Sequence, residues 1–567
     1  MNSIKKRGSL FCHAVFMFAL FFTIFLNACS GDGGSSNTES DSLTSVSISD
    51  ASKVKPSETL ELSATVNTTG NPTGITYKWE VTEGASLSST DETKTTLTAG
   101  DDEKTVTVTF TATYGETVKS ASKEIKITNS LADLIVTPGA KVTTNGWADM
   151  ANNEAGMSYP DTTNIIVIDD KTYPTAKAKC TAFTNAIASG SVSNSSITAT
   201  AAIIVVSGEV DLSANTITGG VTVKEWFKQF DNSTHKRTHE DIVYDIGSNK
   251  AIIGVNGAKL SYGGLRVYAN HLTPENIIIQ NIEFSDAHGS TEYDTSISGE
   301  YESGKKYSDS KASIDNLVIE SNTKTGYVYN YVAQNIWIDH CKFSDGDCKD
   351  LLRNYNHDGA LDVKAVKYMT VSYCEFTNHD KVTLIAPGDD YVSEEQRQIT
   401  FHHIYYHDTV QRTPRSRGCQ VHLYNCYWNS IGFSGADDNT SGSNGGFMLG
   451  PGIGSQYIVE NNYFGTLNVS GATVIKYFDK TESTSTATLS KIYLNGNNKT
   501  FSTDNDATYD SVNKLKLTSH LSSTKPWTPG YSYTPSEASS LPKLIPAAAG
   551  VDKEGYTATV EVNGTTY

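Results

Sequence analysis

The sequence predicts a mostly β protein in which a small β-sandwich precedes a long parallel β-helix. Three observations predict it: a composition that favours strands, a run of short alternating strands, and six segments that share one pattern. The composition has 30 Tyr and 44 Gly beside only 6 Met, and aromatic side chains fit a pleated surface well. At 567 residues the chain is too long for one ordinary compact core, so several units or one elongated repeat is expected.

The chain begins with a segment typical of protein export. Residues 1–28 contain a basic stretch, residues 5–7, followed by an apolar run, which predicts a signal peptide rather than a spanning helix of the mature protein. The sequence LNAC ending at Cys29 resembles a bacterial lipobox, which implies cleavage before Cys29 and lipidation of its thiol. We therefore expect an exported lipoprotein at the outer membrane or cell surface, or a secreted form, with residues 29–43 as a flexible tether. A plain signal peptide with a chance cysteine is the alternative.

The protein is acidic overall. The formal net charge is −18, and removal of residues 1–28, with three positive and no acidic residues, makes it −21. This negative charge argues against nucleic acid as a partner, so we expect no nucleic-acid binding. We also expect the protein to be a monomer. An acidic polymer would also be repelled, so an acidic substrate requires a local basic cluster or a bound cation.

Residues 44–129 contain several short runs in which apolar and polar residues alternate. Strands at this spacing, with Trp79 in the middle, predict a small β-sandwich that resembles bacterial immunoglobulin-like domains. The region has no cysteine, so Trp79 would pack without the disulfide of antibody domains. Two roles stay open: a spacer that holds the next domain away from the membrane, and a sugar-binding module.

A different pattern begins at about residue 132 and becomes visible when six segments are aligned on their terminal aromatics. Apolar residues stand at the second and fourth positions of each, and this period of two predicts one buried face. The alternation then slips by one position, so the chain must bend. The aromatics are 22 to 59 residues apart, which fits stacked coils with variable loops, although alternation alone also fits an ordinary sandwich. The segments are 276–284, 335–343, 368–376, 398–406, 420–428 and 456–464.

The bend is expected to carry a ladder of polar and aromatic residues, followed by a second inward-facing row. In that row Cys341, Cys374 and Cys426 would pack as small apolar side chains. Coil stacking at about 4.8 Å also allows a Cys341–Cys374 disulfide, which export permits but spacing does not dictate. We assign His340 and His403 of this ladder to structure rather than catalysis. The ladder is Asn281, His340, Tyr373, His403, Asn425 and Asn461.

Acidic and basic residues form separate clusters on consecutive predicted coils. Asp358 and Asp362 are hard oxygen ligands of the kind that Ca²⁺ binds. In a straight strand their Cα atoms would lie about 13 Å apart, so sharing one ion requires a bend, which Gly359 permits. A solvated acidic turn is the alternative. Four basic residues follow, which either belong to a functional site or form an ordinary cluster of surface charge. They are Lys381, Arg412, Arg415 and Arg417.

The motifs in this region, in this order, resemble the pectate lyase and pectin lyase family of polysaccharide lyases, whose fold is a right-handed parallel β-helix. The resemblance covers roughly residues 132–567 and includes a closing segment at 527–550. It implies a calcium-dependent pectate lyase that cleaves α-1,4-linked polygalacturonate, the backbone of pectin, by β-elimination to 4,5-unsaturated oligogalacturonides. The motifs are WIDH at 337–340, HDGALDVK at 357–364, MTVSY at 369–373, HDK at 379–381 and QRTPRSRG at 411–418.

The resemblance implies that three aspartates hold calcium. Asp358 and Asp362 match the family's acidic pair, and Asp315 matches a third ligand from the preceding coil. A calcium ion that bridges protein and substrate would neutralise the galacturonate carboxylate. Loss of the C5 proton, which is otherwise difficult, then becomes feasible because the enolate-like charge that develops is stabilised.

The basic residues match the remaining parts of the family's site. Arg412 matches the catalytic arginine that removes the C5 proton, and Lys381 and Arg417 match residues that bind substrate carboxylates. Arg415 and Lys364 are expected to make secondary contacts, with balancing of nearby acids as the alternative for Lys364. Because a guanidinium normally stays protonated, the role of Arg412 predicts an alkaline pH optimum.

Three features depart from the family pattern. Ser313 stands where some members have a further aspartate, residues 323–332 look inserted after Asp315, and residues 386–390 differ from the usual glycine-serine loop at the edge of the cleft. The rival functions are a calcium-independent pectin lyase, in which the three aspartates would have no purpose, and a non-catalytic glycan-binding surface β-helix. A non-catalytic glycan-binding protein would be expected to lack a catalytic residue, yet Arg412 is present.

Overall fold

The computed structural model describes residues 41–49, 53–54, 57–102, 104–127, 136–188, 200–215, 242–287, 293–294, 306–307, 314–346, 357–431, 446–468, 472–478, 489–503, 507–509, 517–553, 561–562 and 565–566. The predicted signal segment 1–28, Cys29, most of the tether and Ser313 lie outside the described residues. The chain forms two compact units, one mainly of residues 41–125 and one mainly of residues 126–566. None of the described helices is long and apolar enough to cross a membrane.

The N-terminal unit contains two four-stranded sheets with the orders β1-β3-β6-β5 and β2-β8-β7-β4. Trp79 and Phe110 are buried next to each other, with ring centroids 4.7 Å apart, and the Trp79 indole donates to the Glu92 carbonyl at 2.8 Å. The immunoglobulin-like assignment stays a prediction. The strands are β1 (Ser42–Ile48), β2 (Lys53–Val54), β3 (Thr59–Thr69), β4 (Thr76–Val81), β5 (Ala85–Leu87), β6 (Lys94–Ala99), β7 (Lys104–Tyr114) and β8 (Thr117–Ile127).

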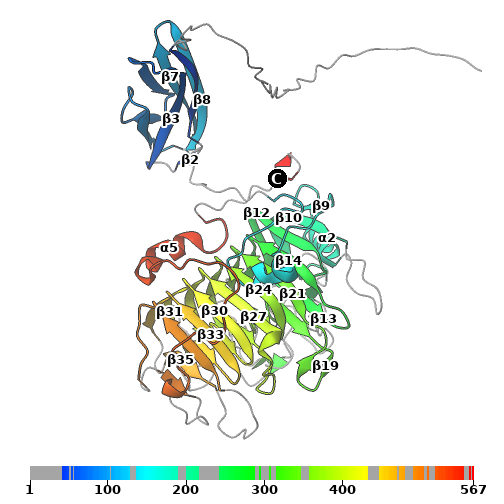
Figure 1. Cartoon of the computed structure of the whole chain (residues 1–567). Helices are drawn as coiled ribbons and strands as arrows, with labels where there is room; N and C mark the ends of the chain where they lie inside the picture. The colour runs from blue at the N-terminus through cyan, green and yellow to red at the C-terminus, as the bar shows by residue number, and fades with distance from the viewer. Residues whose placement is uncertain are drawn as a thin grey trace, which may run out of the picture. The chain divides into compact units, whose positions relative to one another are not determined.

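The second unit is built from stacked coils whose strands form three parallel faces. Face A consists of the first strand of each coil, and its strands lie side by side along this unit in Figure 1. Helix α2 (Ala176–Ala188) packs the buried Phe183 and Ile187 next to its first strands. The strands of face A are β9 (Ile165–Ile168), β10 (Ala202–Asp211), β12 (Lys250–Ser261), β14 (Glu275–Gln280), β21 (Ala333–Asp339), β24 (Val366–Ser372), β27 (Arg397–His402), β30 (Cys419–Tyr424), β33 (Ser455–Glu460) and β36 (Lys491–Asn495).

Face B follows face A in each coil, and face C follows face B. Face B begins with the last residues of β10, Glu209–Asp211, which pair with the second half of β12. It continues through β15 (Glu283–Ser285), β22 (Lys342–Ser344), β25 (Glu375–Lys381), β28 (Tyr405–Gln411), β31 (Tyr427–Ile431) and β34 (Tyr463–Leu467). Face C contains β11 (Val243–Asp245), β13 (Gly264–Ala269), β18 (Leu317–Ser321), β23 (Leu361–Val363), β26 (Leu384–Ile385), β29 (Arg415–Ser416), β32 (Phe447–Pro451), β35 (Thr473–Tyr477) and β37 (Ala507–Tyr509). The predicted parallel β-helix is confirmed.

The remaining described elements are short and lie outside the three faces. Three antiparallel pairs are β16 (Tyr293–Asp294) with β17 (Lys306–Tyr307), β19 (Lys324–Thr325) with β20 (Val328–Tyr329), and β38 (Glu561–Val562) with β39 (Thr565–Thr566). The helical elements are η1 (Trp147–Met150), α1 (Ala151–Glu154), η3 (Glu394–Gln396), η5 (Leu517–Ser519), η6 (Ala538–Ser540) and α5 (Leu541–Ala548).

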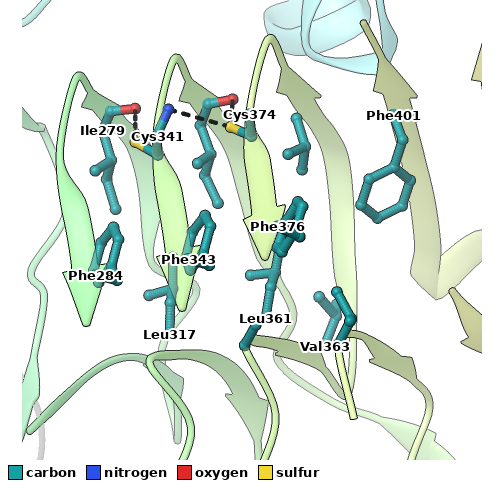
Figure 2. Packing of buried hydrophobic residues seen from close by; sticks show 14 of the residues in the cluster. Ile279, Phe284, Leu317, Cys341, Phe343, Leu361, Val363, Cys374, Phe376 and Phe401 are labelled. Atoms are coloured by element: carbon teal, nitrogen blue, oxygen red, sulfur yellow. Dashed lines mark hydrogen bonds between the residues drawn. The ribbon is translucent and has the colours of Figure 1, made fainter. Parts of the chain in front are cut away.

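The six segments aligned in the sequence stack in register. Their second residues are partners on successive strands, beginning with Ile277 opposite Ile336 and Ile336 opposite Met369. Their terminal aromatics form a ladder inside the helix, and Figure 2 shows its first members side by side. Ring centroids in the ladder are 4.7 to 5.4 Å apart. The aligned pattern is therefore the stacking pattern of the core.

The predicted bend lies between faces A and B, and its cause is a residue in the left-handed conformation. All six ladder residues have φ between 48° and 56°, which reverses the side-chain alternation at that position. Such a conformation costs a non-glycine residue roughly 1–2 kcal/mol. Contacts between coils oppose this cost: the Tyr373 ring stacks between His340 and His403, with centroids 4.8 and 4.5 Å away. These two histidines thus lie in the corner ladder, as expected.

The cysteines of the second inward row are buried thiols. Cys341, Cys374 and Cys426 are free, and the Cys341 amide donates to the Cys374 sulfur at 3.4 Å (Figure 2). The disulfide alternative is therefore not realised between these neighbours. Cys348 lies outside the described residues.

Segments from both ends of the second unit cover the outer side of face A. Trp147 stacks on Trp527 with ring centroids 4.9 Å apart, and the Tyr531 hydroxyl lies 2.8 Å from the Thr400 hydroxyl. Beneath them, His402 donates from Nε2 to the Thr144 carbonyl at 2.8 Å. Burial lowers the pKa of His402 from 6.5 to about 4, because a charged imidazole is disfavoured there.

We expect the free energy of unfolding to decrease as pH falls from about 6.5 to about 4. The unfolded state binds a proton at His402 in this window and the folded state does not, so protonation favours unfolding by up to about 3 kcal/mol. Chemical denaturation across this pH range should show a shallower dependence for His402→Gln than for the unmodified protein. The exposed His271→Gln serves as control, and an identical pH dependence in all three proteins would contradict the assignment.

Candidate active site

Four of the predicted site residues gather at one edge of face C, whereas Arg415 lies on β29 and Arg417 follows that strand at the opposite edge. The strands of face C are parallel, so the residues that directly precede them lie along the same edge. Asp315 precedes β18, Asp358 precedes β23, Lys381 precedes β26 and Arg412 precedes β29. Four consecutive coils therefore each contribute one charged residue to this edge.

Three carboxylates meet around Gly359. The Gly359 amide donates to Asp315 Oδ1 at 2.6 Å, and a Cβ added at Gly359 would lie 2.4 Å from Asp362 Oδ1 and 2.8 Å from Asp315 Oδ1. Asp362 stands opposite Val318 on β18 and accepts from the Leu384 amide at 2.8 Å. The glycine therefore lies between two carboxylates.

The chain bends beside this glycine, as the sharing of one ion between Asp358 and Asp362 requires. The bend is at Ala360, and Gly359 is not among the glycines with positive φ. The expected reason for the glycine, its backbone freedom, is thus wrong. Its lack of a side chain is what the site needs, because any Cβ would occupy the space of the two carboxylates.

The electrostatics of the cluster favour a bound cation. Burial and the nearby charges of Asp362 and Asp358 raise the pKa of Asp315 well above its ordinary range. Burial also raises the pKa of Asp362 to about 7, despite the opposing field of Arg412. Lys381 compensates part of the charge with an ammonium 3.1 Å from Asp358 Oδ1. A cation would relieve the remaining repulsion between the carboxylates.

The donor set fits Ca²⁺, which binds carboxylate oxygens in flexible geometry. Among the described residues, no group of three or more His, Cys, Asp or Glu side chains is arranged so that it could hold a metal ion by itself. An ion at the cluster around Gly359 would therefore need further oxygen ligands from water or from a bound molecule.

The arginines differ in their surroundings. Arg412 has a left-handed backbone with φ of 63° and is partly exposed, and its Nε has no hydrogen-bond partner in the part of the chain that the structure describes. Arg415 stacks on Phe478, with Cζ 4.1 Å from the ring centroid. Arg417 donates from Nε to Asp389 Oδ1 at 2.8 Å.

Two ion-pair partners at the site, Asp389 for Arg417 and Glu320 for Lys364, were not predicted from the sequence. Asp389, in the loop at 386–390 that departs from the family pattern, forms an ion pair with the substrate-binding candidate Arg417. The two adjacent aspartates of this loop, Asp389 and Asp390, are the sequence feature that could have indicated such a partner. Lys364 pairs with Glu320 at 3.0 Å, which agrees with charge balancing rather than with substrate contact. Asp315 takes its predicted place beside Asp358, because Ile314 bridges to His357.

Comparison with known proteins identifies the family. A family model described as pectate lyase matches residues 122–554, which is more than half of the chain. The chain belongs to the pectate lyase family. The predicted family resemblance is confirmed to this extent.

Individual relatives of this pectate lyase family member match more locally. The chain is 31% identical over 258 residues to "Pectate lyase" of Bacillus subtilis (strain 168), which covers 43% of this chain and 54% of that protein. It is 32% identical over 185 residues to "Pectate trisaccharide-lyase" of Thermotoga maritima, which covers 32% of this chain and 40% of that protein. The chain thus spans about half the length of these curated relatives. A pectate lyase structure from Acidovorax avenae subsp citrulli matches with a TM-score of 0.48 and 19% identity, covering 75% of this chain and 98% of that one.

We expect Gly359→Ala to destabilise the protein by about 1–3 kcal/mol, because the added methyl group must displace Asp362 or Asp315. Gly388→Ala is the matched control, since its Cβ would approach only the Tyr391 ring at an ordinary 3.7 Å. Denaturant unfolding of both variants measures the difference. Equal stability of the two variants would show that the carboxylates do not crowd Gly359.

Proposed function

We propose that the protein is a calcium-dependent pectate lyase that cleaves α-1,4-linked polygalacturonate by β-elimination to 4,5-unsaturated oligogalacturonides. The observation that carries this proposal is the gathering of three carboxylates around Gly359, with Lys381 and Arg412 on the next two coils. Membership of the pectate lyase family supports it.

The residues of the site suit the steps that the reaction requires. Asp315, Asp358 and Asp362 would hold calcium, which when bound supplies positive charge to neutralise the galacturonate carboxylate next to C5. Lys381 and Arg417 would bind carboxylates of the chain and hold the reacting sugar in place. These cations also stabilise the negative charge that develops as the C5 proton leaves.

Arg412 would remove the C5 proton. It lies one coil beyond Lys381 at the same edge of face C, is partly exposed, and has an unpartnered Nε within the described residues. No ion pair that the structure describes ties its guanidinium to a carboxylate, in contrast to Arg417. It is therefore placed to meet substrate at the edge that also carries the carboxylates.

We further propose that the enzyme is exported and anchored through Cys29. The support is the basic and apolar pattern of residues 1–28 and the lipobox-like LNAC sequence. A monomer acting on pectin at the cell surface is consistent with this route.

The purified protein should release unsaturated uronide from polygalacturonate, seen as rising ultraviolet absorbance, and excess chelator should abolish the rise. Arg412→Ala should lower the rate by several orders of magnitude while polygalacturonate binding survives, and Lys342→Ala, a surface cation on face B, should leave the rate unchanged. Cleavage of methylated pectin that ignores the chelator would favour the pectin lyase alternative. Absence of cleavage of either polymer would favour a glycan-binding surface protein.

Calcium should raise the melting temperature of the chelator-treated protein by a few degrees, because it binds the folded cluster and not the unfolded chain. Asp362→Asn should abolish this rise without lowering the melting temperature in chelator, since the amide oxygen can still accept from Leu384 and one repelling charge is removed. Asp408→Asn, the same change at an exposed carboxylate of face B, should keep the full response. An unaltered response in Asp362→Asn would exclude calcium from this cluster.

A further inference from the structure

The connection from β18 to β21 is an additional hairpin with an aromatic tip. Strands β19 and β20 pair with Lys324 opposite Tyr329, and Gly326, with φ of 63°, makes the turn. The tip side chains are well exposed, with Tyr327 52% and Val328 48% accessible. The corresponding connection in the next coil, between β23 and β24, has only two residues.

This hairpin lies at the edge of face C opposite the charged residues. Residues that follow the parallel strands share that edge, and the hairpin follows β18 as Arg417 follows β29. Tyr329 packs in one buried cluster with Ala365 and Ala386, which follow β23 and β26, and with Tyr391. The outer side of face C is therefore bordered by the carboxylates and Arg412 on one edge and by the hairpin and Arg417 on the other.

The hairpin is held firmly, so its exposed tip has a defined position. Gln396 accepts from the Tyr329 amide at 3.0 Å and donates to the Tyr329 carbonyl at 2.7 Å. The Tyr391 ring stacks on Tyr329 with centroids 5.4 Å apart and meets the Tyr327 ring edge-on at 5.5 Å. The Lys324 ammonium donates to the Tyr391 hydroxyl and lies 6.0 Å from the Tyr327 ring centroid.

We propose that Tyr327 and Lys324 form a binding subsite for a uronide unit of the polygalacturonate chain, beyond the sugars that contact the cleavage residues. The proposal rests on the proposed function. An exposed aromatic face can pack on a sugar ring, and the adjacent ammonium matches its carboxylate. The chain as a whole carries a net charge of −18, so a cation beside an exposed ring is a specific local attraction for an anionic polymer.

Continuity with the proposed cleavage site identifies the polymer as the occupant. Tyr391, which touches the tip, belongs to the same loop as Asp389, which binds Arg417. Between β18 and β29 lie three coil steps, roughly 14 Å at about 4.8 Å each. A polymer that crosses the strands of face C can therefore span the distance from the Arg417–Asp389 pair, where Arg417 is only 8% exposed, to the hairpin, whereas a single sugar cannot.

Binding of oligogalacturonates of increasing length to the non-cleaving Arg412→Ala protein, measured by calorimetry with calcium present, tests the subsite. Tyr327→Ala and Lys324→Gln in that background should weaken binding of long oligomers about fivefold to tenfold and leave the shortest binding oligomers unaffected. In the active enzyme the same changes should raise KM for polygalacturonate by a similar factor with kcat unchanged. Val328→Ala, the exposed neighbour at the tip, is the matched control.

The possible outcomes separate the subsite from the proposed function. If the protein cleaves polygalacturonate but Tyr327→Ala and Lys324→Gln bind every length as tightly as Val328→Ala, the subsite is wrong and the function stands. If Arg412→Ala binds no uronide of any length and the active protein cleaves none, both are wrong. A change in oligomeric state on Tyr327→Ala, seen by light scattering, would make the tip a contact between copies of the chain and overturn the subsite.

Discussion

The register between stacked parallel coils is the constraint on which the site depends. One left-handed residue per coil turns the chain from face A to face B, and the corners are joined by ring stacking of His340, Tyr373 and His403 and by a hydrogen bond from the Asn425 side-chain amide to the Asn461 carbonyl. With that corner aligned, residues at equivalent positions of later turns also align. Asp315, Asp358, Lys381 and Arg412, which are far apart in the sequence, therefore meet at one edge of face C. A slip of one residue in a single coil would move its side chain to the opposite side of the strand.

The aspartate cluster opposes the stability of the fold that holds it. Asp315 and Asp362 are partly buried on either side of Gly359, and both have raised pKa values. Such crowding is unfavourable without a compensating charge, yet it makes the cluster attractive to a cation. Gly359 allows the two carboxylates to approach by leaving the space between them empty.

The fold and much of the site could be predicted because both depend on short-range patterns. Period-two alternation, the slip at the corner and the terminal aromatics all appear within segments of nine residues, and the structure stacks these segments in register. The site motifs could be recognised for the same reason. The pairing of Asp389 with Arg417 and the partner of Lys364 could not, because variable turns bring those residues together and no pattern relates their positions.

By itself the sequence determined the position of the bend, the inward rows and the charged residues that would be available to a site, while the resemblance of its motifs to a known family favoured the parallel β-helix over an ordinary sandwich. Alternation and residue chemistry are local properties of the chain, so they can be read without coordinates. Only the tertiary structure decided which charges face each other, why Gly359 lacks a side chain, and that the β19–β20 hairpin lies across face C from the aspartates. Those relations depend on how separate coils and turns pack in space, and the energies of burial and charge that set them exist only after the coils have stacked.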